Sequence, residues 1–139
     1  MSKRENIVKQ FYEVVKSQRT VKFKKVVRDP IIPEELPRTG FPAAYIESTN
    51  EERLNLTASL REANMDIEII IYVQGRDRDT QRNVAIAAIE QSVYEDAVLN
   101  TLVKNIELTN IEIVTVGEAA PYASAKVTFG VNYCYTLDN

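Results

Sequence analysis

The clearest pattern in this chain is an alternation of apolar and polar positions over residues 123–135. Every odd position in this segment is apolar, and the even positions between them are small or polar. Successive side chains of a strand point to opposite faces, so the alternation predicts a strand in a sheet with one buried face and one hydrated face. The hydrated side is a candidate interaction surface, formed by Ser124, Lys126, Thr128 and Asn132.

Two other segments have the period of helices that could cover the buried face. The first begins at Ser2, where Ser2 and Glu5 form a capping box that satisfies backbone donors of the first turn. Its apolar stripe extends from Ile7 to Val15. The second helix is expected over about residues 80–94, after a turn and N-cap in residues 75–80. Its predicted stripe consists of Val84, Ala85, Ala88, Ile89 and Val93.

Further strands are predicted where β-branched and aromatic residues gather. We expect strands at residues 20–28, 43–47, 65–74 and 106–116, the last with a bulge between Ile113 and Val114. Residues 54–60 also alternate as a strand would, between polar turns at 50–52 and 61–64. The remaining connections are a loop or single helical turn at 96–103 and a turn at 117–121.

This order of elements predicts an α+β fold: a mixed, mostly antiparallel sheet with one face covered by two helices. Antiparallel pairing is favoured because only the connection through the second helix is long enough for a parallel crossover. The 139 residues suit a single domain over 1–139.

Residues 29–42 are expected to form an extended arm. Four prolines in this segment remove backbone donors and bias each preceding residue toward extended geometry. The arm either folds back on its own domain or reaches a neighbouring molecule, because its large apolar side chains gain free energy from burial. These side chains are Ile31, Ile32, Leu36 and Phe41.

Charge is unevenly distributed along the chain. Residues 1–28 contain nine Lys or Arg and two acids, a net charge of +7, whereas the remaining residues contain eight basic and eighteen acidic residues, a net charge of −10. A basic edge could dock on the acidic edge of an identical neighbour, bind nucleic acid, or simply be solvated. The candidate basic residues are Lys22, Lys24, Lys25 and Arg28.

The composition offers little chemistry for catalysis. The chain has no histidine, and its four glycines are scattered, so triad, zinc and phosphate-loop chemistries are disfavoured. Asp77 and Asp79 are better explained by helix capping than by a metal site, and with Glu118 they are the least improbable residues for an enzyme. The single Cys134 fits a reducing compartment, and we expect no signal peptide, membrane segment, cofactor or metal.

The layout resembles a known family at several points. Phe41-Pro42-Ala43-Ala44-Tyr45-Ile46 precedes a polar segment, and residues 65–75 lead into the helix at 80–94. An Asp-x-x-Leu step at Asp96 to Leu99 and two terminal strands follow. In this order the chain resembles the tail terminator, or tail completion, proteins of long-tailed bacteriophages, and is similar to the related head-tail completion proteins.

The resemblance implies a structural protein of the virion, assembled in the host cytoplasm and without enzymatic activity. Such proteins form a ring, commonly a hexamer, on the head-proximal end of the tail tube, where they stop polymerisation and provide the head-tail joining interface. The implied partners are further copies of the chain, the tail tube protein and a head connector or neck protein. A tail sheath is left open as a partner, and genomic DNA passes through the lumen without specific binding. A neck connector and a non-specific nucleic-acid-binding module remain the alternatives.

Overall fold

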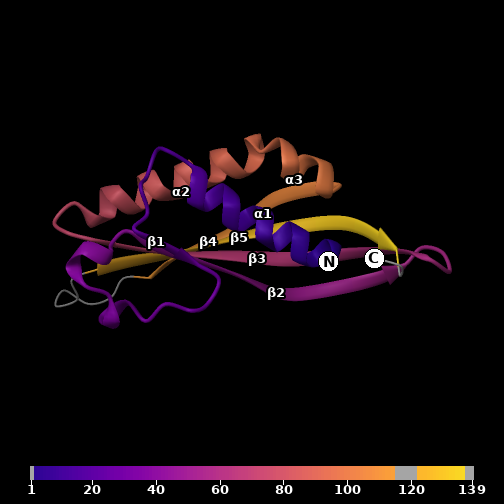
Figure 1. Cartoon of the computed structure of the whole chain (residues 1–139), viewed down its shortest axis with the longest axis horizontal. Coiled ribbons are helices and arrows are strands. Elements are labelled where there is room, and N and C mark those ends of the chain that lie inside the picture. The colour runs from indigo at the N-terminus through magenta and orange to yellow at the C-terminus, as the bar shows by residue number, and fades with distance from the viewer. Residues whose placement is uncertain (1, 115–121, 137–139) are drawn as a thin grey trace.

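The structure is a computed structural model that describes residues 2–114 and 122–136. Its centre is a five-stranded sheet in the order β1-β2-β3-β5-β4, in which the alternating C-terminal segment forms β5 (Figure 1). β1 and β2 are parallel, and all other neighbouring strands are antiparallel. The predicted α+β class with a mixed, mostly antiparallel sheet is confirmed. The strands are β1 (Lys25–Val27), β2 (Ala43–Asn55), β3 (Leu60–Gln74), β4 (Asn105–Val114) and β5 (Tyr122–Thr136).

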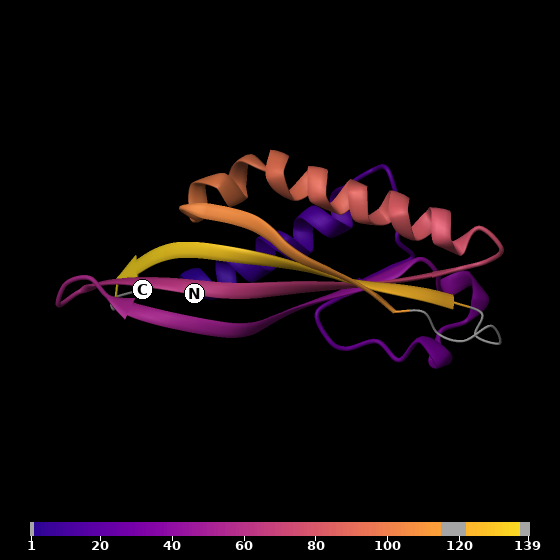
Figure 2. The ribbon, with the colours of Figure 1, turned by 180° about the vertical axis from the view of Figure 1, so that it is seen from behind.

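The helices lie on one face of this sheet (Figures 1 and 2). They are α1 (Lys3–Ser17), α2 (Arg78–Glu95) and the short α3 (Ala97–Leu102). The Ser2 hydroxyl accepts the Glu5 N–H at 3.1 Å, which confirms the predicted start of α1, although the Glu5 carboxylate pairs with Arg28. The helical turn expected near residue 96 is α3, where the Asp96 carboxylate accepts the Leu99 N–H at 2.8 Å.

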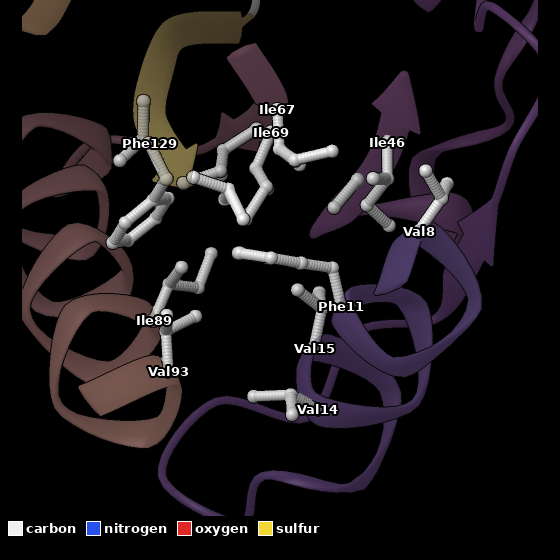
Figure 3. Packing of buried hydrophobic residues seen from close by; sticks show 14 of the residues in the cluster. Val8, Phe11, Val14, Val15, Ile46, Ile67, Ile69, Ile89, Val93 and Phe129 are labelled. Carbon is white, nitrogen blue, oxygen red and sulfur yellow. The ribbon is translucent and has the colours of Figure 1, made fainter. Parts of the chain in front are cut away.

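The core fills the space between the helices and the sheet (Figure 3). Phe11 of α1 and Phe129 of β5 meet with ring centroids 5.7 Å apart, and Ile89 of α2 points into the same space. The odd positions of β5 from Ala123 to Tyr133 are buried, as the alternation predicts. Each large side chain buried in this way stabilises the fold by about 1.5–3 kcal/mol.

The Pro-rich segment forms the parallel crossover. Residues 28–42 connect β1 to the parallel β2 through two 3₁₀ turns, η1 (Pro33–Glu35) and η2 (Arg38–Gly40). The expectation that only the connection through the second helix could serve as a parallel crossover is therefore wrong. An extended chain spans about 3.3–3.6 Å per residue, so this segment is long enough to cross the sheet without an α-helix. It does so on the face away from the helices (Figures 1 and 2).

Several predicted strand boundaries are wrong. β2 continues through residues 50–52, because the shift in register between Ser48 and Glu51 is a bulge and not a turn. The hairpin turn lies at 56–59, and β3 already includes residues 61–64. Of the strand expected at residues 20–28, only Lys25–Val27 forms a strand that pairs with β2. The bulge in β4 lies between Leu108 and Asn110, while the turn expected at 117–121 lies outside the described residues.

The start of α2 also differs from the prediction. Val84 is 44% exposed, whereas Arg82 and Ile86 are buried. The Asp77 carboxylate accepts from the Gln81 amide at 2.5 Å, and Asp79 pairs with Arg82 at 2.6 Å. Asp77 is the N-cap residue of α2, as expected for residues 75–80, and Asp79 lies in the first turn, but neither aspartate makes a side-chain cap hydrogen bond.

Candidate assembly surface

The face of the sheet away from the helices, here called the open face, has ordered polar pairs at its centre. The Lys126 ammonium of β5 lies 3.4 Å from the Glu112 carboxylate of β4 and 3.9 Å from that of Glu68 in β3. Attraction to Glu68 and a hydrogen bond to Glu112 raise the pKa of Lys126. The Asn132 amide donates to Glu62 at 2.9 Å and to Asn64 at 2.7 Å. The open face is thus held in shape by cross-strand contacts.

Acidic side chains dominate this face. Because Glu47 of β2 lies directly opposite Glu68 of β3, two like charges are neighbours there, which is unfavourable unless a cation lies close. Lys126, beside Glu68, provides that cation. The other acidic residues at open-face positions of β3 and β4 are Glu62, Asp66, Glu107 and Glu112.

Aromatic side chains occupy one end of the open face. Tyr45, Tyr72 and Tyr122 form a row across β2, β3 and β5, with neighbouring ring centroids 6.3 and 6.0 Å apart. Phe41 stacks on Tyr122 at 6.3 Å, and the Tyr122 hydroxyl donates to the Glu34 carboxylate at 2.6 Å. That hydrogen bond raises the pKa of Tyr122 and lowers the pKa of Glu34. Sequence reasoning missed this row because its members come from three separate strands.

The arm folds back on its own sheet over these aromatics. Ile31 and Phe41 are buried and Leu36 is half-buried, whereas Ile32 is 56% exposed. Of the two possibilities that the sequence left open for the arm, the fold back on the domain is the one observed. Ile32 alone among its four predicted apolar residues remains mostly accessible to a neighbour.

The arm also covers part of the predicted polar surface. Ser124 is buried and lines a hollow of about 350 Å³ together with Pro33, Glu34 and Lys126. Thr128 is buried as well. The expectation that the even positions of β5 are all hydrated is therefore wrong at Ser124 and Thr128, and it holds in part at the half-buried Lys126 and Asn132.

The predicted basic residues lie along the β1 edge. Lys22, Lys24 and Lys25 are exposed. The Arg28 guanidinium binds the Glu5 carboxylate at 2.5 and 3.0 Å, so its charge is used within the chain. This bidentate contact lowers the pKa of Glu5 and raises that of Arg28. The partner of Arg28 could not be read from the sequence because the two residues belong to different elements.

A second basic group lies where β3 meets α2. Arg38, Arg76 and Arg78 line a hollow of about 410 Å³ with Gln74 and Gly75. Gly75 has φ of 109°, a conformation that other residues rarely adopt, so the chain turns sharply here into α2. None of these three arginines has an ion-pair partner among the described residues.

The described residues contain neither a group of metal-ligating side chains nor a membrane-spanning helix. Among residues 2–114 and 122–136, no three His, Cys, Asp or Glu side chains are grouped to hold a metal ion. Within the same residues, no helix has both the length and the apolar character needed to cross a membrane. Glu118, named above as an enzyme candidate, lies outside the described residues.

A comparison of the chain with protein-family models gives no match, and a comparison with curated protein sequences gives none either.

Proposed function

We propose that this chain is a structural tail terminator that forms a ring on the head-proximal end of a phage tail tube. One observation carries the proposal: the open face is an extended polar surface whose side chains already pair with one another. Lys126 is held between two carboxylates and Asn132 between two acceptors, so docking this face requires little further ordering of side chains. Such a surface suits flat contact with another ring or the lining of a lumen.

The charge of the open face supports a role in lining the lumen of the ring. Glu47, Glu62, Asp66 and Glu68 repel phosphates, so DNA passes such a surface without binding to it. In this proposal the partners are further copies of the chain, the tail tube protein and the head connector. Six copies per ring is the proposed stoichiometry. A neck completion protein is the related alternative, which would bind the connector and not the tube end.

The test is inhibition of tube growth. Purified protein is added to tube protein polymerising from short tube seeds, and tube lengths are measured by electron microscopy. We expect the wild type to stop growth and to form a ring at one end. Lys126→Glu puts a third carboxylate beside Glu68 and Glu112, which disturbs the lumen surface of the ring, and it should reduce this effect. Lys9→Glu makes the same charge change on the exposed side of α1 and should not. Unchanged tube lengths and bare tube ends with the wild type would contradict the proposal.

The arginine hollow supports a second candidate, non-specific nucleic-acid binding. Arg38, Arg76 and Arg78 offer three guanidinium groups, and Lys22 lies nearby because it and Asp77 line one pocket. Neutralising several phosphates would make affinity fall by roughly 0.9 log units per log unit of salt for each phosphate. A binding curve with duplex and single-stranded DNA at low salt tests this. No binding to either would eliminate the candidate.

A further inference from the structure

The outer edge of β4 is an unprotected strand edge in the described structure. β4 is the last strand of the sheet, and no described strand pairs with its outer side. The Tyr94 hydroxyl accepts the Leu108 N–H at 2.7 Å and so covers one point of this edge. From Asn110 to Val114 no described residue covers it by hydrogen bonding, and Ile113 is 45% exposed. Exposed apolar edge strands are templates for pairing with another chain.

The opposite edge of the sheet complements β4 in direction. β1 and β2 run the same way, and each later step across the sheet reverses the direction, so β4 runs antiparallel to β1. A second copy placed sideways in the same orientation therefore brings its β1 edge antiparallel to β4. Antiparallel pairing is the more stable arrangement per residue.

The two edges also match in their position along the strand direction and in their apolar character. The registers place Val26, Ala44, Ile71, Ala125 and Ile113 on one line across the sheet, so β1 and the end of β4 lie at the same height. These residues share the helix-covered face. Val26 of one copy and Ile113 of the other would therefore contact each other when two copies lie side by side.

Charge distinguishes the edges. Lys24 and Lys25 are exposed at the β1 edge, whereas Glu107 and Glu112 are exposed on β4. The registers put Lys25, Glu107 and Glu112 on the open face, so opposite charges approach on the same side of a joined sheet. The registers put Lys25 level with Val114, so Glu112, two residues along β4, is the acid nearest to it in a joined sheet, and Glu107 lies further along the strand.

We infer that the β4 edge binds the basic edge, residues 22–28, of a second copy of this chain. The inference rests on the proposed ring and names its subunit contact. Because the two surfaces differ, the contact is head-to-tail, and it closes into a ring when the rotation between copies is right.

Pairing of β4 with another β4 is the competing arrangement. In one antiparallel register that keeps the faces matched, Glu107 of each copy lies opposite Glu112 of the other. Like charges in directly opposite positions destabilise a strand pair, and this arrangement contains two such pairs. The basic edge avoids that repulsion.

A charge exchange tests the contact. The first variant combines Lys24→Glu with Lys25→Glu, and the second combines Glu107→Lys with Glu112→Lys. We expect each variant alone to lose the wild-type oligomer in native mass spectrometry. An equal mixture should restore it with an even number of copies, because opposite charges then meet at every contact. The matched control, Lys3→Glu with Lys9→Glu on α1, should assemble as the wild type does. Circular dichroism confirms that each variant is folded.

Carbodiimide cross-linking provides a readout that does not depend on stable variants. The outer strands are four strand spacings apart, about 19 Å, so a zero-length link between them cannot form within one chain. We expect wild-type protein to give links from Lys24 or Lys25 to Glu112, between labelled and unlabelled copies.

Each outcome decides the inference. Wild-type rings without these links, formed also by both variants, would overturn the contact but leave the ring proposal standing. A first variant that still assembles would show that Lys24 and Lys25 are not in the contact, would favour pairing through β4 alone and would overturn the inference. Wild-type protein that neither assembles nor cross-links at any concentration would overturn the contact, and bare tube ends in the growth assay would overturn the ring as well.

Discussion

The hydroxyl of Tyr133 is expected to make a measurable contribution to stability. Tyr133 is 1% exposed, and its hydroxyl donates to the Glu51 carboxylate at 2.7 Å. The Glu51 carboxylate also forms ion pairs with the guanidinium groups of Arg4 of α1, at 3.2 Å, and of Arg53, at 2.6 Å. These residues close the end of the core by joining α1, β2 and β5. Burial and the hydrogen bond to Glu51 both raise the pKa of Tyr133.

The substitution Tyr133→Phe removes this hydrogen bond with little change in shape. A hydrogen bond to a charged group contributes about 1.5–3 kcal/mol. Because Arg4 and Arg53 still satisfy the carboxylate, we expect a loss near the lower end, about 1.5–2 kcal/mol. Tyr135→Phe is the matched control, since the Tyr135 hydroxyl accepts from Arg53 at 2.8 Å in a solvent-exposed position. There the expected loss is below about 0.5 kcal/mol.

The assay is equilibrium unfolding in guanidinium chloride, followed by circular dichroism at one fixed protein concentration, because assembly makes stability concentration-dependent. The free energies of unfolding of both variants are compared with that of the wild type. Equal losses for the two variants, or a loss below about 0.5 kcal/mol for Tyr133→Phe, would refute the buried hydrogen bond to Glu51.

Three further predictions concern the core, acid stability and the open face. Ile89→Ala should destabilise by about 2–5 kcal/mol in the same unfolding assay, whereas Val84→Ala should cost less than about 0.5 kcal/mol; similar losses would contradict the orientation of α2. The pKa of Glu5 is lowered by Arg28, and that of Glu51 is lowered because its hydrogen bonds outweigh burial. Each carboxyl therefore contributes stability that is fully present above its usual pKa of 4.5 and is lost as the pH falls through the lowered pKa. In thermal scans, the melting temperature of the wild type should fall below about pH 4.5, and this decrease should be smaller in Glu51→Gln. Lys126→Met should change the free energy of unfolding by less than about 1 kcal/mol, since half-exposed ion pairs contribute little, and a larger loss would show a structural role.

The sequence predicted the parts of the fold that depend on local pattern. The alternation in β5 and the stripe of α1 are periodic over their whole length, so their faces could be assigned without knowing what covers them. Residues 54–56 show the limit of this reasoning. Leu54 and Leu56 alternate as buried strand residues do, yet both are exposed near the hairpin tip.

Errors occurred where a tertiary contact decides the local structure. The bulge at Ser48–Glu51 is supported by Arg4 of α1, which bonds to the side chains of both residues, and no local signal records that contact. Arg82 of α2 is buried although its charge suggests exposure. Its guanidinium pairs with Asp79.

The candidate surface was predicted only in part. Lys126 and Asn132 were identified because they belong to the alternating strand, but their acidic partners come from neighbouring strands. The β4 edge escaped notice because the strand order, which leaves β4 without an outer neighbour, is a property of the whole fold. The basic segment was visible as charge, whereas its relation to β4 required the register of every strand between them.

Ring formation is the central claim, and electron microscopy of the purified protein, alone and on tail tubes, tests it most directly. We predict closed rings with six-fold symmetry, in which the helices lie outside and the open face lines the lumen. A protein that stays monomeric at every concentration and leaves tube ends bare would contradict it.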